Sequence, residues 1–174
     1  MAVAEEQFGE IYDLYIEKIY RFVYLKVNSQ EIAEDITSKV FTKGWEVYKR
    51  KFQDQDQNNE IHNPGAFLYQ IARNAVIDYY RQKNRTNAVS ADAAPELLDN
   101  RTGAYDKAVL AADVERVKKA IGSLKKDYQD VLIWHYLDDV PVAEIAQILN
   151  KKEGAVRVML HRGLRDLKEI IRQV

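Results

Sequence analysis

Apolar residues recur three or four positions apart through almost all of the 174-residue chain, and this period constrains the fold more than any other feature. Side chains at this spacing fall on one face of an α-helix, whereas a half-buried strand needs strict alternation, which no segment sustains. The clearest stripe consists of Phe8, Ile11, Tyr12, Tyr15, Ile19, Phe22 and Val23. Because 47% of the residues are apolar, such stripes can be buried in a core. We therefore expect an all-α protein.

Capping signals divide the N-terminal half of the pattern into separate helices. Asn28 and Glu31 have the spacing of a capping box, which predicts that a second helix starts there and ends near Phe52. Asn63 and Pro64 suit an N-cap and a first-turn proline, and they predict the start of a third helix. Residues 53–63 carry no apolar pattern and several turn formers, so we expect an exposed loop between the two.

A change of composition separates two parts of the chain. Residues 86–107 are rich in Ala, Asn, Asp, Pro and Gly and show little periodicity. About twenty flexible residues have an end-to-end distance of roughly 25 Å, enough to hold two modules well apart. The sequence therefore predicts two small helical domains, residues 1–85 and 108–174, joined by a flexible linker at 86–107.

The second domain ends in a predicted helix-turn-helix. "PVAEIAQILN" and residues 153–172 read as two helices around the short polar turn "NKKEG". Their expected packing residues are Ala143, Ile145, Ala146 and Leu149 in the first helix, and Val156, Leu160, Leu164, Leu167 and Ile171 in the second. Arg157, His161, Arg162 and Arg165 then face outward, as in a helix that enters the DNA major groove. A helical hairpin with a solvated basic face is the alternative interpretation.

The predicted third helix contains a second basic segment, "IARNAVIDYYRQKNR", which has four cations and one acid. We expect Leu68, Ile71, Ala72, Ala75 and Tyr79 on its buried side, and Gln70, Arg73, Asn74, Arg81, Asn84 and Arg85 on the opposite side. Cations that follow phosphates beside aromatic rings that stack on bases are typical of single-strand binding. Asn58, Asn59 and Asn63 in the preceding loop add amides that can hydrogen-bond an extruded base. A solvated surface is the alternative here too.

Charge and composition narrow the classes of function. The net charge is −1, but residues 1–60 hold 8 basic and 12 acidic side chains, whereas residues 151–174 hold 7 basic and 3 acidic ones. This asymmetry suits a protein that contacts both another protein and a polyanion. The chain has no cysteine, no span long enough for a membrane, no metal-ligand spacing and no glycine-rich phosphate loop. We expect a soluble, cytoplasmic, non-enzymatic protein without a cofactor or membrane insertion.

Three segments, in this order, resemble the extracytoplasmic-function (ECF) sigma factors, small two-domain members of the sigma-70 class of bacterial transcription initiation factors. They are "IAEDITSKVFTKGW", "FLYQIARNAVIDYYRQKNR" and "SLKKDYQDVLIWHYLDDVPVAEIAQILNKKEGAVRVMLHRGLRDLK". The resemblance implies a first domain that docks on the β′ clamp helices of core RNA polymerase and opens the minus-ten element. It implies a second domain that meets the β flap and reads the minus-thirty-five element. It also implies regulation by an anti-sigma factor.

The resemblance assigns residues to each surface. The residues expected to bind core RNA polymerase are Glu34, Asp35, Ile36 and Phe41. The residues expected to contact the minus-ten DNA are Asn58, Asn59, Asn63, Arg73, Asn74, Asp78, Tyr80, Arg81 and Arg85. The residues expected to contact the minus-thirty-five DNA are Lys152, Arg157, Val158, His161, Arg162 and Arg165. Ser38, Lys39, Lys152 and Ala155 depart from residues common in the family. Two alternatives stay open: a helix-turn-helix regulator that binds duplex DNA without polymerase, and a helical adaptor that reads no DNA.

Overall fold

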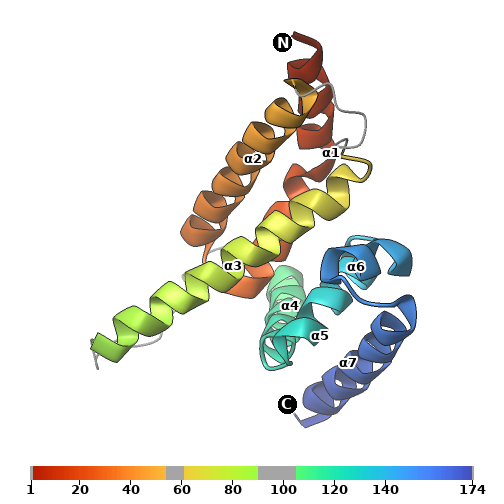
Figure 1. The fold of residues 1–174 in the computed structure, drawn as a ribbon. Helices are drawn as coiled ribbons and strands as arrows, with labels where there is room; N and C mark the ends of the chain where they lie inside the picture. The colour runs from red at the N-terminus through yellow and green to blue at the C-terminus, as the bar shows by residue number, and fades with distance from the viewer. Residues whose placement is uncertain (1, 54–60, 90–104, 174) are drawn as a thin grey trace.

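The computed structural model describes residues 2–53, 61–89 and 105–173, and within these ranges it contains helices and no strand (Figure 1). This confirms the all-α prediction. The elements are α1 (Ala2–Val27), α2 (Gln30–Gln53), α3 (Pro64–Val89), α4 (Tyr105–Gly122), α5 (Lys126–Leu132), the π-helical turn η2 (Ile133–Leu137), α6 (Val142–Leu149) and α7 (Glu153–Gln173).

Helices α1, α2 and α3 pack on one another and form the N-terminal unit (Figure 1). The predicted stripe of α1 supplies its core, since Ile19, Phe22 and Val23 have no exposed surface. Leu68 and Ala72 of α3 are buried against it, as the helical period predicted. Tyr12 departs from the prediction: its side chain is exposed, although its ring contacts that of Phe41.

The start of α3 agrees with the sequence, but the start of α2 does not. The Ala66 backbone N–H donates to the side-chain oxygen of Asn63 at 2.9 Å, so Asn63 is the predicted N-cap. The capping box at Asn28 and Glu31 is wrong, because α1 runs to Val27 and Asn28 lies in the left-handed region with φ 53°. Asparagine tolerates this conformation, and its backbone N–H closes α1 by donating to the Tyr24 carbonyl.

Helices α4 to α7 form the C-terminal unit, in which α6 and α7 are the predicted helix-turn-helix. Close packing sets the position of α7, because a Cβ atom at Gly163 would lie 3.2 Å from the Tyr128 Cβ of α5. Val156 and Leu160 are buried as expected. Ala143 was wrongly predicted in the packing face: it is exposed and Ile148 is buried instead, because α6 packs against α3 as well as α7.

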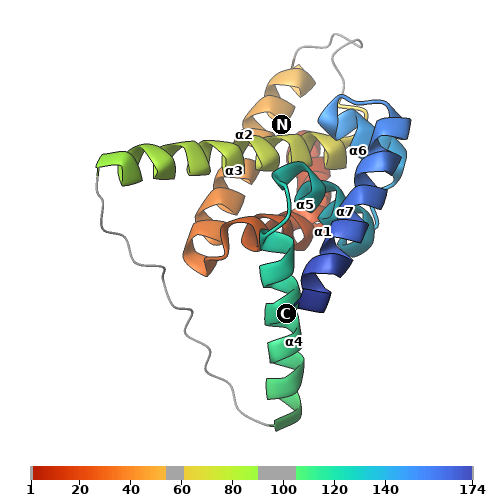
Figure 2. The same cartoon turned by 90° about the horizontal axis from the view of Figure 1, so that it is seen from below.

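Most of the predicted linker lies outside the described residues, and the two units are not held apart. Helix α3 continues to Val89 and α4 begins at Tyr105, so both ends of the 86–107 segment are helical. Residues 90–104 lie outside the described ranges. The two units pack directly on each other, with α4 against α1 and α6 against α3, and the C-terminal end of α3 projects away from both (Figures 1 and 2). The domain boundaries themselves stay a prediction.

Candidate nucleic-acid interface

The basic face of α7 projects into solvent. Arg157, His161, Arg162 and Arg165 are all exposed, as predicted, and so are Lys152 and Val158. Two of these arginines have acidic partners close by on the same helix: Arg157 pairs with Glu153 at 2.9 Å and Arg165 with Asp166 at 3.1 Å. Exposed pairs of this kind are weak and exchange readily for other partners. The face is therefore available to a polyanion.

The turn before α7 fixes the angle at which this face is presented. Asn150 ends α6 in the left-handed region with φ 50°, which asparagine tolerates. The Lys151 backbone N–H then donates to the Ala146 carbonyl at 2.9 Å, and the Ala155 N–H donates to the Lys152 carbonyl at 3.0 Å. These bonds close a connection of three residues between α6 and α7. They join α6 and α7, which pack against each other, in the order of a helix-turn-helix.

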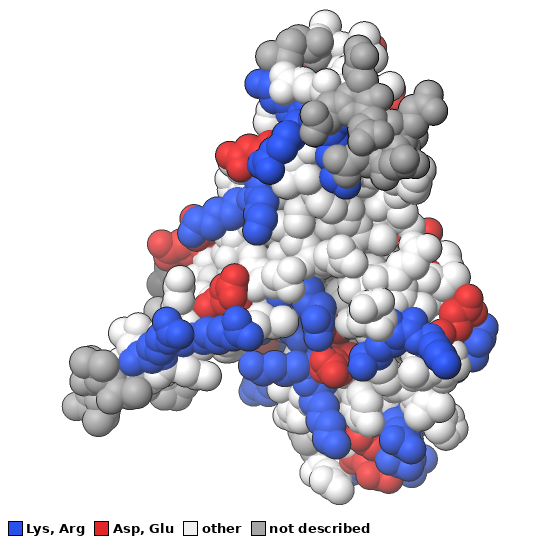
Figure 3. Space-filling view, viewed as in Figure 1, with Lys and Arg blue, Asp and Glu red and all other residues white. Residues whose placement is uncertain are grey.

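The predicted minus-ten residues do not form one surface. Asn74, Asp78, Arg81 and Arg85 are exposed, and Lys and Arg side chains are visible in Figure 3 along the end of α3 that projects from the molecule. Asn63 caps α3, and Asn58 and Asn59 lie outside the described residues. Arg73 and Tyr80 instead contact the C-terminal unit. The same helix thus has an exposed basic end, residues 81–87, which we call the arm of α3, and a covered segment around Arg73 and Tyr80.

Arg73 is held by two carboxylates of α5. Its guanidinium contacts Asp130 at 3.0 Å and Asp127 at 3.1 Å. Asp130 also lies 2.7 Å from the ammonium of Lys26, and the side chains of Lys26 and Asp130 are only 5% and 3% exposed. One buried carboxylate therefore joins α1, α3 and α5. We call the contact between residues 2–89 and 105–173 the domain junction.

Tyr80 is also engaged at the domain junction. Its hydroxyl donates to the Lys26 carbonyl oxygen, and the Lys126 ammonium lies 4.6 Å from the centre of its ring. Burial, and to a lesser extent the neighbouring Tyr79, raise the pKa of Tyr80 above its ordinary value. The ring face that we expected to stack on a base is therefore occupied by a lysine in this arrangement.

A second buried carboxylate, Asp138, lies at the other end of the domain junction. It accepts hydrogen bonds from the Arg21 guanidinium and from the Tyr69 hydroxyl, the latter at 2.8 Å. Its side chain is fully buried. Burial and the Asp138 carboxylate raise the pKa of Tyr69 far above its ordinary value, so Tyr69 stays a donor.

Between the two carboxylates the domain junction is apolar. The Phe22 and Trp134 rings stack with their centres 5.2 Å apart, and Tyr69 lies 5.7 Å from the same indole. Sequence reasoning missed this contact. A signal existed, because Asp130, Trp134 and Asp138 recur every four positions and therefore share one helix face. That stripe has the composition of an interface, with an aromatic residue between two acids.

The predicted polymerase-docking residues divide by exposure. Glu34 and Asp35 are exposed, whereas Ile36 and Phe41 belong to the core. Lys39, one of the departures from the family, pairs with Asp35 at 2.6 Å and offsets its charge. Beside them a groove of about 460 Å³ runs between α1 and α2, lined by aromatic side chains and by Glu17 and Glu34. An acidic groove with aromatic walls suits a basic helical partner.

Other classes of site find no support in the parts of the chain that the structure describes. Within residues 2–53, 61–89 and 105–173, histidine, aspartate and glutamate side chains do not gather in threes where they could hold a metal ion. Nor does any helix there have the length and apolarity required to cross a bilayer.

Both halves of the chain match sigma-70 families. Residues 11–86 match the family described as Sigma-70 region 2, and residues 114–167 match Sigma-70, region 4. The first match contains the acidic α1–α2 groove and the arm of α3. The second contains the helix-turn-helix and most of the C-terminal side of the domain junction.

Curated relatives extend the match along the chain. The ECF RNA polymerase sigma factor BldN of Streptomyces coelicolor is 26% identical over 167 residues, which cover 95% of this chain and 61% of BldN. The ECF RNA polymerase sigma factor SigW of Bacillus subtilis is 28% identical over 178 residues, which cover 98% of this chain and 91% of SigW.

A solved structure has the same fold. The sigma factor RpoE from Bartonella quintana, in complex with the anti-sigma factor NepR, superposes with a TM-score of 0.72 at 19% identity, over 96% of this chain and 98% of RpoE. Two sigma-70 regions in sequence order, in a chain whose curated relatives are ECF sigma factors, agree with the motifs found in the sequence. The chain therefore belongs to the ECF group of the sigma-70 family.

Proposed function

We propose that this chain is a transcription initiation factor that binds core RNA polymerase, directs it to specific promoters and favours strand opening. One observation carries the proposal: a chain made of sigma-70 regions 2 and 4 exposes a basic face on each, along the arm of α3 and along α7. Such a factor acts where polymerase and chromosome meet, in the cytoplasm. Its role is binding, and no step of catalysis is assigned to its own side chains.

Recognition of the minus-thirty-five element is assigned to α7. Arg162 and Arg157 reach base edges or phosphates in the major groove, where a bidentate arginine–guanine contact discriminates by about 1–3 kcal/mol. Lys152, His161 and Arg165 lie on the same exposed surface and contact the backbone. Val158, which is exposed without a polar group, offers a methyl contact to thymine.

Opening of the minus-ten element is assigned to the arm of α3. Arg81 and Arg85 hold the phosphates of the separated strand beside Asn74 and Asp78. A protein that binds the separated strand more tightly than the duplex shifts the equilibrium toward opening without ATP. Arg73 and the ring face of Tyr80 join this surface once the domain junction opens, because Asp130 and Lys126, which cover them, belong to the C-terminal unit.

Two proteins are the proposed partners. Core polymerase supplies the β′ clamp helices, which meet the exposed carboxylates Glu34 and Asp35 beside the α1–α2 groove, and the β flap, which meets the region 4 unit. An anti-sigma factor is the proposed regulator, since a neighbour in fold is a sigma factor bound to a protein of that class. A duplex-binding regulator without polymerase, or an adaptor that reads no DNA, gives no reason for the region 2 match.

The direct test combines core polymerase with the purified chain on a library of promoters, scores the transcripts for sequence enrichment, and maps unpaired thymines with permanganate. We expect a bubble that depends on the chain. Arg81→Ala and Arg162→Ala each reduce transcripts, by about ten-fold where a contact is worth about 1.4 kcal/mol. Arg172→Ala, exposed at the end of α7, is the matched control and leaves them unchanged. Absence of any bubble on any template overturns the proposal.

The assignment of polymerase docking has its own test. Asp35→Ala weakens association with core polymerase, whereas Glu46→Ala, at another exposed acid of α2, does not. Association is measured by titration of labelled chain with core enzyme. Equal affinity of the Asp35 variant and the parent chain places docking elsewhere.

A further inference from the structure

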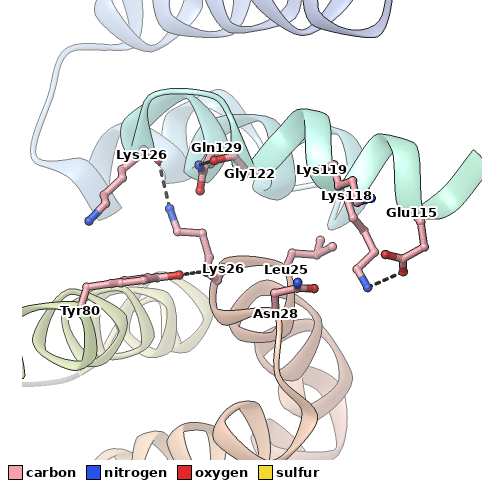
Figure 4. A pocket seen from close by; sticks show the side chains of 10 residues that line it. All are labelled: Leu25, Lys26, Asn28, Tyr80, Glu115, Lys118, Lys119, Gly122, Lys126 and Gln129. Atoms are coloured by element: carbon pink, nitrogen blue, oxygen red, sulfur yellow. Dashed lines mark hydrogen bonds and ion pairs between the residues drawn. The ribbon is translucent and has the colours of Figure 1, made fainter. Parts of the chain in front are cut away.

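A cavity of about 350 Å³ opens at the domain junction, beside Lys26 and Tyr80. The end of α1 and Tyr80 of α3 form one wall, and α4 and α5 form the other (Figure 4). Four lysines line it: Lys26 from the N-terminal unit, and Lys118, Lys119 and Lys126 from the C-terminal unit. Figure 4 shows Lys26 between Tyr80 and Lys126 on one side and Lys118 and Lys119 on the other.

Cations outnumber the carboxylates at this cavity. Glu115 is the one acid among the lining residues, and Asp130 lies behind Lys26. The two carboxylates have fixed partners: Asp130 pairs with Lys26, and Glu115 with Lys118 at 2.8 Å. Lys119 and Lys126 are exposed, and neither has a carboxylate partner among the described ion pairs. When the two units pack together, the lysines therefore give the cavity a net positive charge, because Glu115 and Asp130 offset only part of it.

The four lysines differ in burial and in their partners. Lys26 and Lys118 are held in place, Lys118 also by a hydrogen bond of 3.0 Å to the Tyr24 hydroxyl. Burial by itself lowers the pKa of Lys118, but its hydrogen bonds to Glu115 and Tyr24 outweigh this, so the pKa is raised and the ammonium stays charged. Lys119 and Lys126 are exposed and lack a described carboxylate partner, although Lys126 also lies over the Tyr80 ring, and Asn28 adds an amide from the α1 side.

We propose that this cavity is a binding site for a compact multivalent phosphate, of the pyrophosphate or tripolyphosphate class, that bridges the two units. A lysine ammonium is a point charge that suits phosphate oxygens from any direction. Several charges on one small ligand are required, because Lys119 and Lys126 both lack a carboxylate partner among the described ion pairs and a monovalent anion offsets only one of them; contact with the α1 wall then comes through Asn28 and Lys26. The volume accommodates two or three linked phosphates rather than a macromolecule.

A ligand that contacts both walls binds only the closed arrangement and stabilises it by mass action. In that arrangement Arg73 and Tyr80 stay engaged at the domain junction. An effect of the anion on promoter opening rests on the proposed function, whereas binding and stabilisation of the free chain do not. The test therefore uses the free chain alone.

The experiment titrates inorganic tripolyphosphate into the full chain by calorimetry at constant ionic strength. We expect one saturable site and a melting temperature that rises with ligand concentration. Lys119→Gln/Lys126→Gln weakens binding at least ten-fold, and both residues are exposed, so the core is undisturbed. Lys43→Gln/Lys168→Gln removes the same charge from exposed positions away from the cavity and leaves affinity unchanged. Equal weakening in both variants, or equal stabilisation by sodium chloride, overturns the site.

A further variant tests the bridge itself. Asn28→Asp places a negative charge on the α1 wall, and aspartate tolerates the left-handed backbone of this position. It should weaken tripolyphosphate at least ten-fold, while unchanged affinity would show that the N-terminal unit takes no part. A single-stranded oligonucleotide in place of tripolyphosphate distinguishes the source of the phosphate. The small-anion proposal fails if tripolyphosphate does not bind and the oligonucleotide binds with an affinity that falls in the Lys119→Gln/Lys126→Gln variant. In that case the cavity is part of a nucleic-acid binding surface.

Discussion

Helices α3 and α7 both carry a basic face, but the two faces have different partners. On α7 the arginines pair with acids of the same helix, as Arg157 does with Glu153, and both members are exposed. On α3 Arg73 pairs across the domain junction, and one of its partners, Asp130, is buried together with Lys26. The same pattern of cations in sequence therefore gives one surface that is ready to bind and one that is partly held.

The difference is one of solvation. An exposed ion pair contributes at most about 1 kcal/mol, because water and salt replace either partner at little cost. A buried pair broken on one side leaves a charge without water or a partner, at a cost of about 3–5 kcal/mol. The face of α7 can thus exchange its partners freely, whereas Arg73 is released only by a change that also rehydrates the Asp130 cluster.

The strongest way to break this comparison is to change the two carboxylates that hold Arg73. Asp130→Asn keeps the shape of the side chain but removes the charge that Lys26 and Arg73 share. We expect the free energy of unfolding to fall by about 3–5 kcal/mol, measured by urea denaturation.

Asp127→Asn is the matched control, because Asp127 pairs with the same arginine but is 52% exposed. Its loss should stay below about 1 kcal/mol. Equal losses in the two variants would mean that burial does not distinguish these pairs.

The other end of the domain junction gives a smaller effect. Tyr69→Phe removes one hydrogen bond to the buried Asp138 carboxylate and leaves Arg21 in place. We expect a loss of about 2 kcal/mol in the free energy of unfolding, since hydrogen bonds to charged groups are worth about 1.5–3 kcal/mol. Tyr136→Phe, at a tyrosine of η2 that is 54% exposed, should change nothing measurable. A Tyr69 variant as stable as its parent would show that the Tyr69–Asp138 hydrogen bond does not help to hold the units together.

Alkaline pH tests how much the two tyrosines of the domain junction, Tyr69 and Tyr80, contribute to stability. The pKa of Tyr69 and that of Tyr80 are raised above the ordinary 10.0, so the folded chain holds these protons more tightly than the unfolded chain. Their stabilisation is complete below pH 10 and declines as the pH rises above it, by up to about 1.4 kcal/mol per pH unit for each group. Urea denaturation over this range should show the decline, with a shallower slope for Tyr69→Phe. Identical slopes would contradict the assignment.

The smallest effect is expected on α7. Glu153→Gln removes the acid that pairs with Arg157, and the free energy of unfolding should change by less than about 0.5 kcal/mol. If α7 meets DNA as proposed, affinity for duplex should rise a few-fold, because the variant removes a carboxylate from the basic face; fluorescence anisotropy measures this. A loss of stability above 1 kcal/mol would show that the exposed pair behaves like the buried ones.

Local periodicity was enough to predict the helices and one of the two surfaces. The apolar stripe of α1, the Asn63 cap of α3 and the outward arginines of α7 all follow from interactions within a few residues along the chain. Sequence motifs likewise identified the family. These features need no knowledge of the neighbouring elements, because a helix sets the direction of its own side chains.

Only the tertiary structure decided which polar side chains are covered. The helical period placed Arg73 opposite the core of its own unit, yet a second unit packs there and supplies Asp130. The spacing of Asp130, Trp134 and Asp138 marked a helix face but not its partner. A periodic pattern predicts which side chains share a helix face, but not whether that face is buried. Burial depends on segments about 50 to more than 110 residues away in the sequence. Ion pairs between such distant residues form only because tertiary packing brings them together.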